Sequence, residues 1–210
     1  YYCLGCRCLY APRDDHAQCV AYYYEHIRSF AEPYPEVIGI LQRLKKQGVK
    51  RIYTACPNCT VQLRELESFE IIPVWPVLAQ HMTPADATVS TGQFIWHDPC
   101  PTRHNPAQQK AARQLLGICG CDCSEPEHTG CKTRCCGNLH MLSATDPEKS
   151  TALRRSRLAE FPEERTIVSS CEGCLGAFRG EGRDTIHLLE LLFGISKSRG
   201  WSNRIKTTLK

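Results

Sequence analysis

The chain has 210 residues, enough to bury a hydrophobic core as one domain or two small ones. Hydrophobic residues make up 42% and charged residues 23%, which is typical of a globular protein and excludes intrinsic disorder. The net charge of +4 is too small to indicate a nucleic-acid partner. No apolar run approaches the roughly 20 residues that a membrane-spanning helix needs, and no signal peptide is recognisable. We therefore expect a soluble cytoplasmic protein with no direct membrane span.

Cysteine is the unusual component, with fifteen residues in the chain. In a small secreted protein such a content indicates a disulfide framework. The odd count, the C-x-x-C pairs at residues 56–59 and 171–174 and the missing signal peptide favour thiolate–metal binding instead. The cysteines are therefore the first candidates for functional residues.

Strand and helix signals alternate through the first part of the chain. Pro35 lies at the first turn of an amphipathic helix that Gly48 ends, and a strand then runs into the C-x-x-C pair at residues 56–59. Residues 83–92 are polar and rich in turn formers, which is typical of a linker. The elements expected before this linker are a strand at 1–4, helices at 15–30 and 36–47, a strand at 49–55, a helix ending near 66, a strand at 69–72 and a short helix at 77–81.

The same order of signals recurs after the linker. A strand enters Cys100, Asn105 caps a helix, and Asp146 followed by Pro147 opens another helix. The elements expected here are a strand at 94–96, a helix at 106–116, a loop at 117–137, a helix at 147–160, a strand at 166–168, a further helix, a strand at 185–186 and a helix at 188–193 that Gly194 ends.

The two halves align through their motifs. Cys6 corresponds to Cys100, and the C-x-x-C pair at 56–59 corresponds to the pair at 171–174. In both halves an isoleucine lies twelve residues after the second cysteine of the pair. The alternation predicts an α/β fold of two tandem pseudo-symmetric repeats, each a small parallel sheet flanked by helices, with the cysteine pairs at strand carboxyl ends. The predicted division is a degenerate cysteine-rich repeat at 1–82, a complete repeat at 93–195 and a basic C-terminal tail at 196–210.

The second half contains a pattern of five cysteines, C-x34-C-C-G-x33-C-x-x-C. Its members are Cys100, Cys135, Cys136, Cys171 and Cys174. Adjacent cysteines in an extended backbone point to different sides, so they can bind different metal atoms of one cluster, and the following glycine lets the backbone approach an inorganic core closely. Five thiolates in one site carry too much negative charge unless a metal neutralises it. Structural zinc needs only four ligands and would leave one thiol over.

With this duplicated pattern, the chain resembles the CCG cysteine-rich domain family. That family includes the catalytic B subunit of heterodisulfide reductases and iron–sulfur subunits of glycolate and lactate oxidases, of anaerobic glycerol-3-phosphate dehydrogenase and of some succinate dehydrogenases. In heterodisulfide reductases the five cysteines of a CCG motif hold a noncubane [4Fe-4S] cluster. The resemblance implies that the five cysteines of the second half hold such a cluster here.

The first half departs from the family pattern because it has no CCG. Its candidate metal ligands are Cys6, Cys56 and Cys59, completed by Cys3, Cys8 or Cys19. Such a set would form a four-thiolate cluster or a zinc site, and a vestigial site is the alternative. The chain also lacks the four-cysteine cassette of ferredoxins, so electrons are expected to come from a ferredoxin-like or flavin-containing partner subunit.

Further candidates lie close to the five cysteines. His97 and His104 flank Cys100 and are candidate proton donors for a leaving thiolate, because histidine titrates near neutral pH. Four more cysteines precede the CCG and suggest a second metal, a redox-active dithiol or plain reduced thiols. They are Cys119, Cys121, Cys123 and Cys131. The basic tail either docks on an acidic partner or is simply solvated.

The resemblance implies an iron–sulfur oxidoreductase subunit of the heterodisulfide reductase B type. Such a subunit passes electrons from a partner through the CCG-bound cluster to a disulfide or a similar acceptor. One alternative is a non-catalytic electron-transfer or assembly subunit of a larger dehydrogenase complex. Another is a zinc-stabilised interaction domain.

Overall fold

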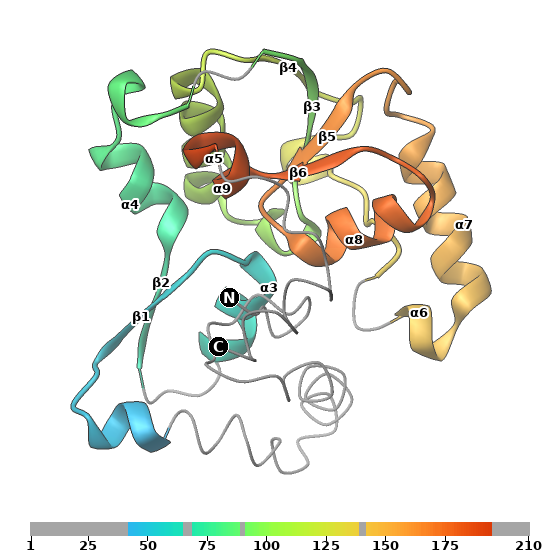
Figure 1. Ribbon diagram of the computed structural model, residues 1–210. Helices are drawn as coiled ribbons and strands as arrows, with labels where there is room; N and C mark the ends of the chain where they lie inside the picture. The colour runs from blue at the N-terminus through green and yellow to red at the C-terminus, as the bar shows by residue number, and fades with distance from the viewer. Residues whose placement is uncertain (1–41, 65–68, 89–90, 139–141, 195–210) are drawn as a thin grey trace, which may run out of the picture.

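The computed structural model describes residues 42–64, 69–88, 91–138 and 142–194 (Figure 1). The predictions that lie outside these residues concern the strand at 1–4, the helix at 15–30, the first turns of the helix at 36–47, the tail at 196–210, and Cys3, Cys6, Cys8 and Cys19. Within the described part, no helix is both long and apolar enough to cross a membrane.

The first sheet is a parallel pair of strands, β1 (Arg51–Thr54) and β2 (Glu70–Pro73). Ile52 lies opposite Ile71 in this pair. The helix α3 (Pro57–Arg64) connects the two strands, and α4 (Val74–His81) follows directly after β2. This order is the β–α–β unit that the sequence predicts, because parallel neighbours need a crossover connection.

The second sheet has four parallel strands in the order β4-β3-β5-β6. They are β3 (Gln93–His97), β4 (Asp122–Ser124), β5 (Thr166–Ser169) and β6 (Thr185–His187). The predicted α/β fold with two small parallel sheets flanked by helices is therefore confirmed.

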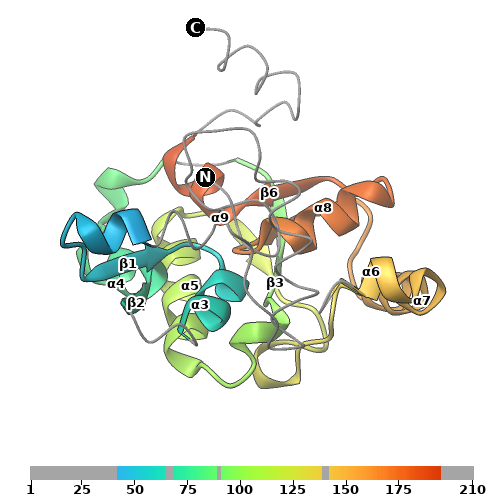
Figure 2. The same ribbon diagram turned by 90° about the horizontal axis from the view of Figure 1, so that it is seen from below.

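We call the described residues up to 82 the first unit and residues 93–194 the second unit. The helices of the second unit connect and cover its strands. They are α5 (Pro106–Ile118), α6 (Leu142–Thr145), α7 (Pro147–Leu158), α8 (Glu172–Gly180) and α9 (Leu188–Phe193). Three short 3-10 turns complete the described elements: η1 (Pro84–Asp86), η2 (Cys100–Thr102) and η3 (Gly130–Lys132). Figure 2 shows the two-stranded sheet and α7 at opposite sides of the molecule.

Local signals determine where several helices begin and end. Asn105 and Asp146 accept hydrogen bonds from the backbone amides of Gln108 and Lys149, as N-caps do. Gly194, the residue after α9, has a φ of +61°, which glycine adopts without strain. The predicted starts and the predicted stop are confirmed.

One predicted loop contains an additional strand. The sequence predicts irregular structure over residues 117–137, but Asp122–Ser124 form β4 at the edge of the larger sheet. The strand is three residues long and pairs only with β3, where Cys123 lies opposite Phe94. A segment this short has no hydrophobic period, so its pairing depends on the neighbouring strand rather than on its own residues.

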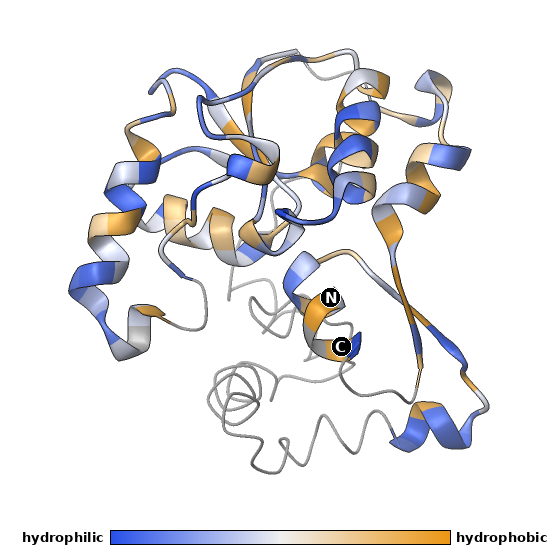
Figure 3. Ribbon diagram, turned by 180° about the vertical axis from the view of Figure 1, so that it is seen from behind, coloured by the Kyte–Doolittle hydropathy of each residue, from blue (hydrophilic) through white to orange (hydrophobic). Residues whose placement is uncertain are grey.

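The larger sheet carries a hydrophobic core on each face. Successive residues of β3 alternate between the two cores, since Ile95 belongs to one and Phe94 and Trp96 belong to the other. The first core includes residues of α3 and α8, and the second includes residues of α4, α5 and α9. Figure 3 shows α7 mostly in blue and white, in keeping with its polar sequence at the side of the molecule.

The repeat seen in the sequence is also visible in the strands. The C-x-x-C pair at 56–59 follows the strand β1, and the pair at 171–174 follows the strand β5. Ile71 lies on β2 and Ile186 on β6, and each of these strands pairs with the strand that precedes the cysteines. The division at residues 82 and 93 stays a prediction, and both cores contain side chains from either side of it.

Candidate metal centre

Three segments bring the five cysteines of the second unit together. Cys100 opens η2 just after β3, and Cys171 is the N-cap residue of α8 just after β5. Because β3 and β5 are parallel neighbours, these two strand ends meet at one edge of the sheet. Cys135 and Cys136 lie on the segment between η3 and α6.

Contacts between the sulfur atoms connect these segments. Cys100 Sγ donates to Cys135 Sγ over 4.0 Å. The side chain of Cys174 is hydrogen-bonded with those of both Cys136 and Cys171. Cys136, Cys171 and Cys174 are almost completely buried, at 3%, 0% and 3% exposure. The structure thus gathers all five cysteines that the pattern singled out.

Proximity keeps several of these thiols protonated. The hydrogen bond to Cys135 and burial raise the pKa of Cys100 well above its usual value. Hydrogen bonds with Cys136 and Cys171, followed by burial, raise the pKa of Cys174 in the same way. For Cys136 the hydrogen bond with Cys135 is the largest cause of a raised pKa. Deprotonating this group of thiols therefore requires a nearby positive charge, which a bound metal supplies.

The backbone around the adjacent cysteines is specific to glycine. Gly137 has a φ of +86°, and its amide donates to Cys135 Sγ over 3.3 Å. Its carbonyl oxygen accepts from Ser150 Oγ at 2.8 Å, which joins the CCG segment to α7. A Cβ at this position would lie 2.2 Å from the carbonyl oxygen of Ser150. The glycine is therefore required both by its conformation and by the close approach of α7.

A buried carboxylate fixes the loop that precedes the CCG. Asp98, 1% exposed, accepts hydrogen bonds from Trp96 Nε1, from the Arg113 guanidinium and from the amide of Gly130. Its carbonyl oxygen accepts from Thr133 Oγ1 at 2.7 Å. Burial alone would raise the pKa of Asp98, but the hydrogen bonds from Arg113 and Trp96 outweigh it and lower the pKa. Asp98 positions Gly130–Thr133 through hydrogen bonds to residues more than 30 positions away in the chain. No local sequence signal indicates such contacts.

A buried arginine of α7 contacts the end of β3 and the loop that precedes the CCG. Arg157 of α7 is fully buried and directs its guanidinium at His97 Nδ1, with both Nε and Nη2 at 3.2 Å. It also donates to the carbonyl oxygen of His128 and to Glu160. Its carbon Cζ lies 4.6 Å from the centre of the Phe161 ring. Arg157 was not a predicted site residue, because nothing in a polar helix marks one arginine as buried.

The two candidate histidines differ in environment. His97 is fully buried, and burial followed by the charge of Arg157 lowers its pKa to about 3. Since Nδ1 accepts from Arg157, the neutral ring carries its proton on Nε2, which has no hydrogen-bond partner among the described residues. His104 is exposed, close after η2. That either histidine donates a proton to substrate stays a prediction.

The first C-x-x-C pair approaches this centre. Cys56 and Cys59, each 2% exposed, belong to the same hydrophobic core as Cys136, Cys171 and Cys174. Cys56 is held in a disulfide in the structure. Metal binding by the first unit stays a prediction, because Cys6 lies outside the described residues and Cys56 could bind a metal only after its disulfide is reduced.

The four other described cysteines of the loop lie elsewhere. Cys119 is buried, and burial raises its pKa to about 11. A hydrogen bond with Cys123, which lies in β4, lowers the pKa of Cys121 to about 7. Cys131 is exposed on η3. These residues are not brought into the five-cysteine group by any contact that the structure gives.

The donor set fits a cluster with several metal atoms. It has five sulfur atoms from three segments, and thiols whose pKa values require a compensating positive charge. Within the described ranges, no three His, Cys, Asp or Glu side chains are arranged around one point as ligands of a single ion would be. Ligands of a cluster bind different metal atoms and need not converge in that way.

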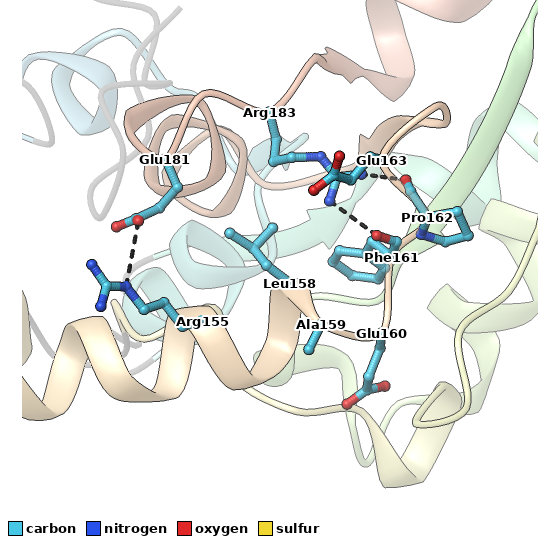
Figure 4. Close-up of a pocket in the computed structure, with 9 residues that line it drawn as sticks. All are labelled: Arg155, Leu158, Ala159, Glu160, Phe161, Pro162, Glu163, Glu181 and Arg183. Atoms are coloured by element: carbon cyan, nitrogen blue, oxygen red, sulfur yellow. Dashed lines mark hydrogen bonds and ion pairs between the residues drawn. The ribbon is translucent and has the colours of Figure 1, made fainter.

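A separate pocket of about 550 Å³ lies between α7 and the segment after α8. Figure 4 shows that its arginines point to neighbouring groups rather than into open space: Arg155 pairs with Glu181, and Arg183 donates to the carbonyl oxygens of Phe161 and Pro162. The pocket has no cysteine in its lining, so it is not part of the thiol site.

Fold and site together define a thiol-rich α/β protein with a candidate metal centre at the carboxyl ends of parallel strands. The family model of the CCG cysteine-rich domain matches residues 39–64 and 94–179, which together are more than half of the chain. The chain belongs to this family. This membership supports iron–sulfur binding and electron transfer as the general function. A comparison with curated proteins found no match.

Proposed function

We propose that this protein is an iron–sulfur oxidoreductase subunit of the heterodisulfide reductase B type. The observation that carries the proposal is the gathering of five cysteines, three of them almost fully buried, where two neighbouring parallel strands end. Cys100, Cys135, Cys136, Cys171 and Cys174 would hold a [4Fe-4S] cluster of the noncubane type. The cluster, when bound, would supply reversible one-electron chemistry close to an electron acceptor.

The protein residues would bind and orient the cluster. Five thiolates provide the ligands, and the amide of Gly137 stabilises negative charge on Cys135 Sγ. Asp98 and Arg157 keep the segments that carry the ligands in place through buried hydrogen bonds. Burial and the charge of Arg157 lower the pKa of His97 to about 3, so the ring is neutral at physiological pH and would act as an N–H donor rather than as a proton source.

The acceptor in this proposal is a disulfide. Its reduction consumes two electrons and two protons and releases two thiols. A ferredoxin-like or flavin-containing partner subunit would supply the electrons one at a time. The exposed His104, four residues after Cys100, is the candidate for delivering a proton.

Metal analysis of protein purified without oxygen tests the cluster assignment. We expect a brown protein with about four irons and a similar amount of sulfide per chain. Replacing a buried ligand in Cys136→Ser should remove most of the visible absorbance, whereas Cys131→Ser, which changes an exposed cysteine of the same loop, should leave it unchanged. If the Cys136→Ser variant retains the absorbance, the ligand assignment is wrong.

An activity assay then distinguishes an oxidoreductase from a non-catalytic electron-transfer or assembly subunit. The holoprotein is given reduced methyl viologen as electron donor and a mixed disulfide as acceptor, and the release of thiols is followed. Release that depends on Cys136 supports the proposal. A reducible cluster without thiol release would instead favour a non-catalytic electron-transfer or assembly subunit, and a colourless protein with stoichiometric zinc would favour a zinc-stabilised interaction domain.

A further inference from the structure

A polar side chain of the first unit donates a hydrogen bond to one of the five cysteines of the second unit. Asn58, between the two cysteines of the first C-x-x-C pair, directs its Nδ2 at Cys171 Sγ over a distance of 3.7 Å. The two residues are 113 positions apart. Because sulfur is larger than oxygen, hydrogen bonds to a thiol or thiolate are correspondingly longer than those to a carbonyl, and this contact is one of them.

The position of Asn58 is determined by the structure around it. Pro57 begins α3, which places Asn58 in the first turn of that helix. Thr60 Oγ1 donates to the carbonyl oxygen of Cys56 at 3.2 Å and lies 2.7 Å from Thr54 Oγ1, so the turn is tied back to β1. On its inner side, α3 packs through Cys59 in the same core as Cys171. The hydrogen bonds of Thr60 and the packing of Cys59 in the core therefore hold the Asn58 amide close to the Cys171 thiol.

An amide N–H beside a thiolate ligand affects the redox equilibrium of a cluster. Adding an electron increases the negative charge on the sulfur atoms, so a hydrogen-bond donor stabilises the reduced state more than the oxidised state. Hydrogen bonds to ligand sulfurs are among the factors that determine the reduction potential of iron–sulfur clusters. Since the asparagine amide does not titrate, this contribution does not vary with pH.

We propose that Asn58 is a positioning residue of the CCG centre, which raises the reduction potential of the cluster by donating a hydrogen bond to Cys171. This inference rests on the proposed function, because it requires a cluster on Cys171. It assigns a task to the first unit, which has no CCG of its own: its C-x-x-C turn presents an amide to the ligands of the second unit.

The test is a redox titration of the full-length holoprotein followed by electron paramagnetic resonance. Asn58→Leu removes the donor while keeping a similar volume, and Asn58→Asp removes it while adding a carboxylate next to the thiolate. We expect the leucine variant to have a lower potential, with a tenfold shift in the equilibrium toward the oxidised cluster, which is about 59 mV for one electron. The aspartate variant should shift further in the same direction. Gln80→Leu makes the matched amide-to-leucine change at an exposed position of α4 and should leave the potential unchanged.

The outcomes distinguish this inference from the proposed function. If the parent protein binds no iron and sulfide, both are overturned. If the parent holds a cluster and Asn58→Leu has the parent's potential, the inference alone is overturned. It is also overturned if both Asn58 variants fold with parental stability but bind no cluster, because the amide would then be needed for assembly and not for tuning.

Discussion

At the scale of single residues, Gly137 shows why the adjacent cysteines are followed by glycine. Its φ of +86° lies in the left-handed region, where other residues are strained. Its backbone also contacts Ser150 of α7 so closely that a Cβ would lie 2.2 Å from the carbonyl oxygen of Ser150. The two effects are separable, because Gly182 has a similar φ of +82° and a Cβ there would meet no other atom within 4 Å.

Replacing each glycine by alanine measures the two effects. Gly182→Ala should lower the free energy of unfolding by about 1–2 kcal/mol, which is the cost of placing a Cβ on a left-handed backbone. Gly137→Ala should lower the free energy of unfolding by at least about 2 kcal/mol more than Gly182→Ala does, because α7 must also move away from the CCG segment. Urea unfolding of both variants provides the comparison. Equal losses would show that α7 yields readily and that the close approach is unimportant.

At the scale of elements, α7 connects to the metal centre through a buried cation. Arg157 is fully buried in a helix whose other described residues are mostly polar and exposed. Its hydrogen bonds go to His97 at the end of β3 and to His128 in the loop before the CCG. One side chain thus connects a helix, a strand and a loop, and burial lowers its pKa from the usual value for arginine.

Removing this cation should destabilise the fold. Arg157→Met takes the guanidinium donor away from the His128 carbonyl oxygen and from Glu160, and we expect a loss of about 3 kcal/mol in the free energy of unfolding. Arg155→Met is the control, because Arg155 lies on the same helix with a 74% exposed side chain and should cost less than about 0.5 kcal/mol. Both values come from urea unfolding at neutral pH. Similar costs for the two variants would contradict the role of Arg157 as a connecting residue.

At the scale of the whole molecule, the two units share their hydrophobic cores. Trp75 of α4 is 1% exposed and packs in the core that contains Leu115, Val168 and Leu191 of the second unit. Its ring centre lies 6.0 Å from that of His187. Because α4 packs against α5, the two sheets are connected by a hydrophobic contact as well as by the chain. Such sharing predicts that the units unfold together.

A core substitution tests this cooperativity. Trp75→Ala should lower the free energy of unfolding by about 3–5 kcal/mol, as large-to-small changes of buried aromatic residues do. The conservative Trp75→Phe should cost markedly less. In both variants, circular dichroism and fluorescence should give coincident single transitions. Two separated transitions, with only one moved by the substitution, would show that the units are independent.

Most of the described fold could be predicted because its signals are local. Helix caps at Asn105 and Asp146, the stop at Gly194 and the repeated strand before each C-x-x-C pair depend on neighbouring residues. The strand β4 could not be predicted, because three residues without hydrophobic alternation become a strand only when β3 lies beside them.

The candidate site likewise has features that the sequence predicts and features that it does not. The grouping of the five cysteines could be predicted from their pattern, because Cys100 and the pair at 171–174 follow neighbouring parallel strands and Cys135 and Cys136 stand between them in the chain. The surroundings of these cysteines could not be predicted in this way, because they depend on tertiary contacts: the approach of α7 to Gly137, the buried Arg157 beside His97, and the contact of Asn58 with Cys171. These contacts join residues up to 113 positions apart, and their geometry is set by the packing of side chains in the core, which no local pattern encodes.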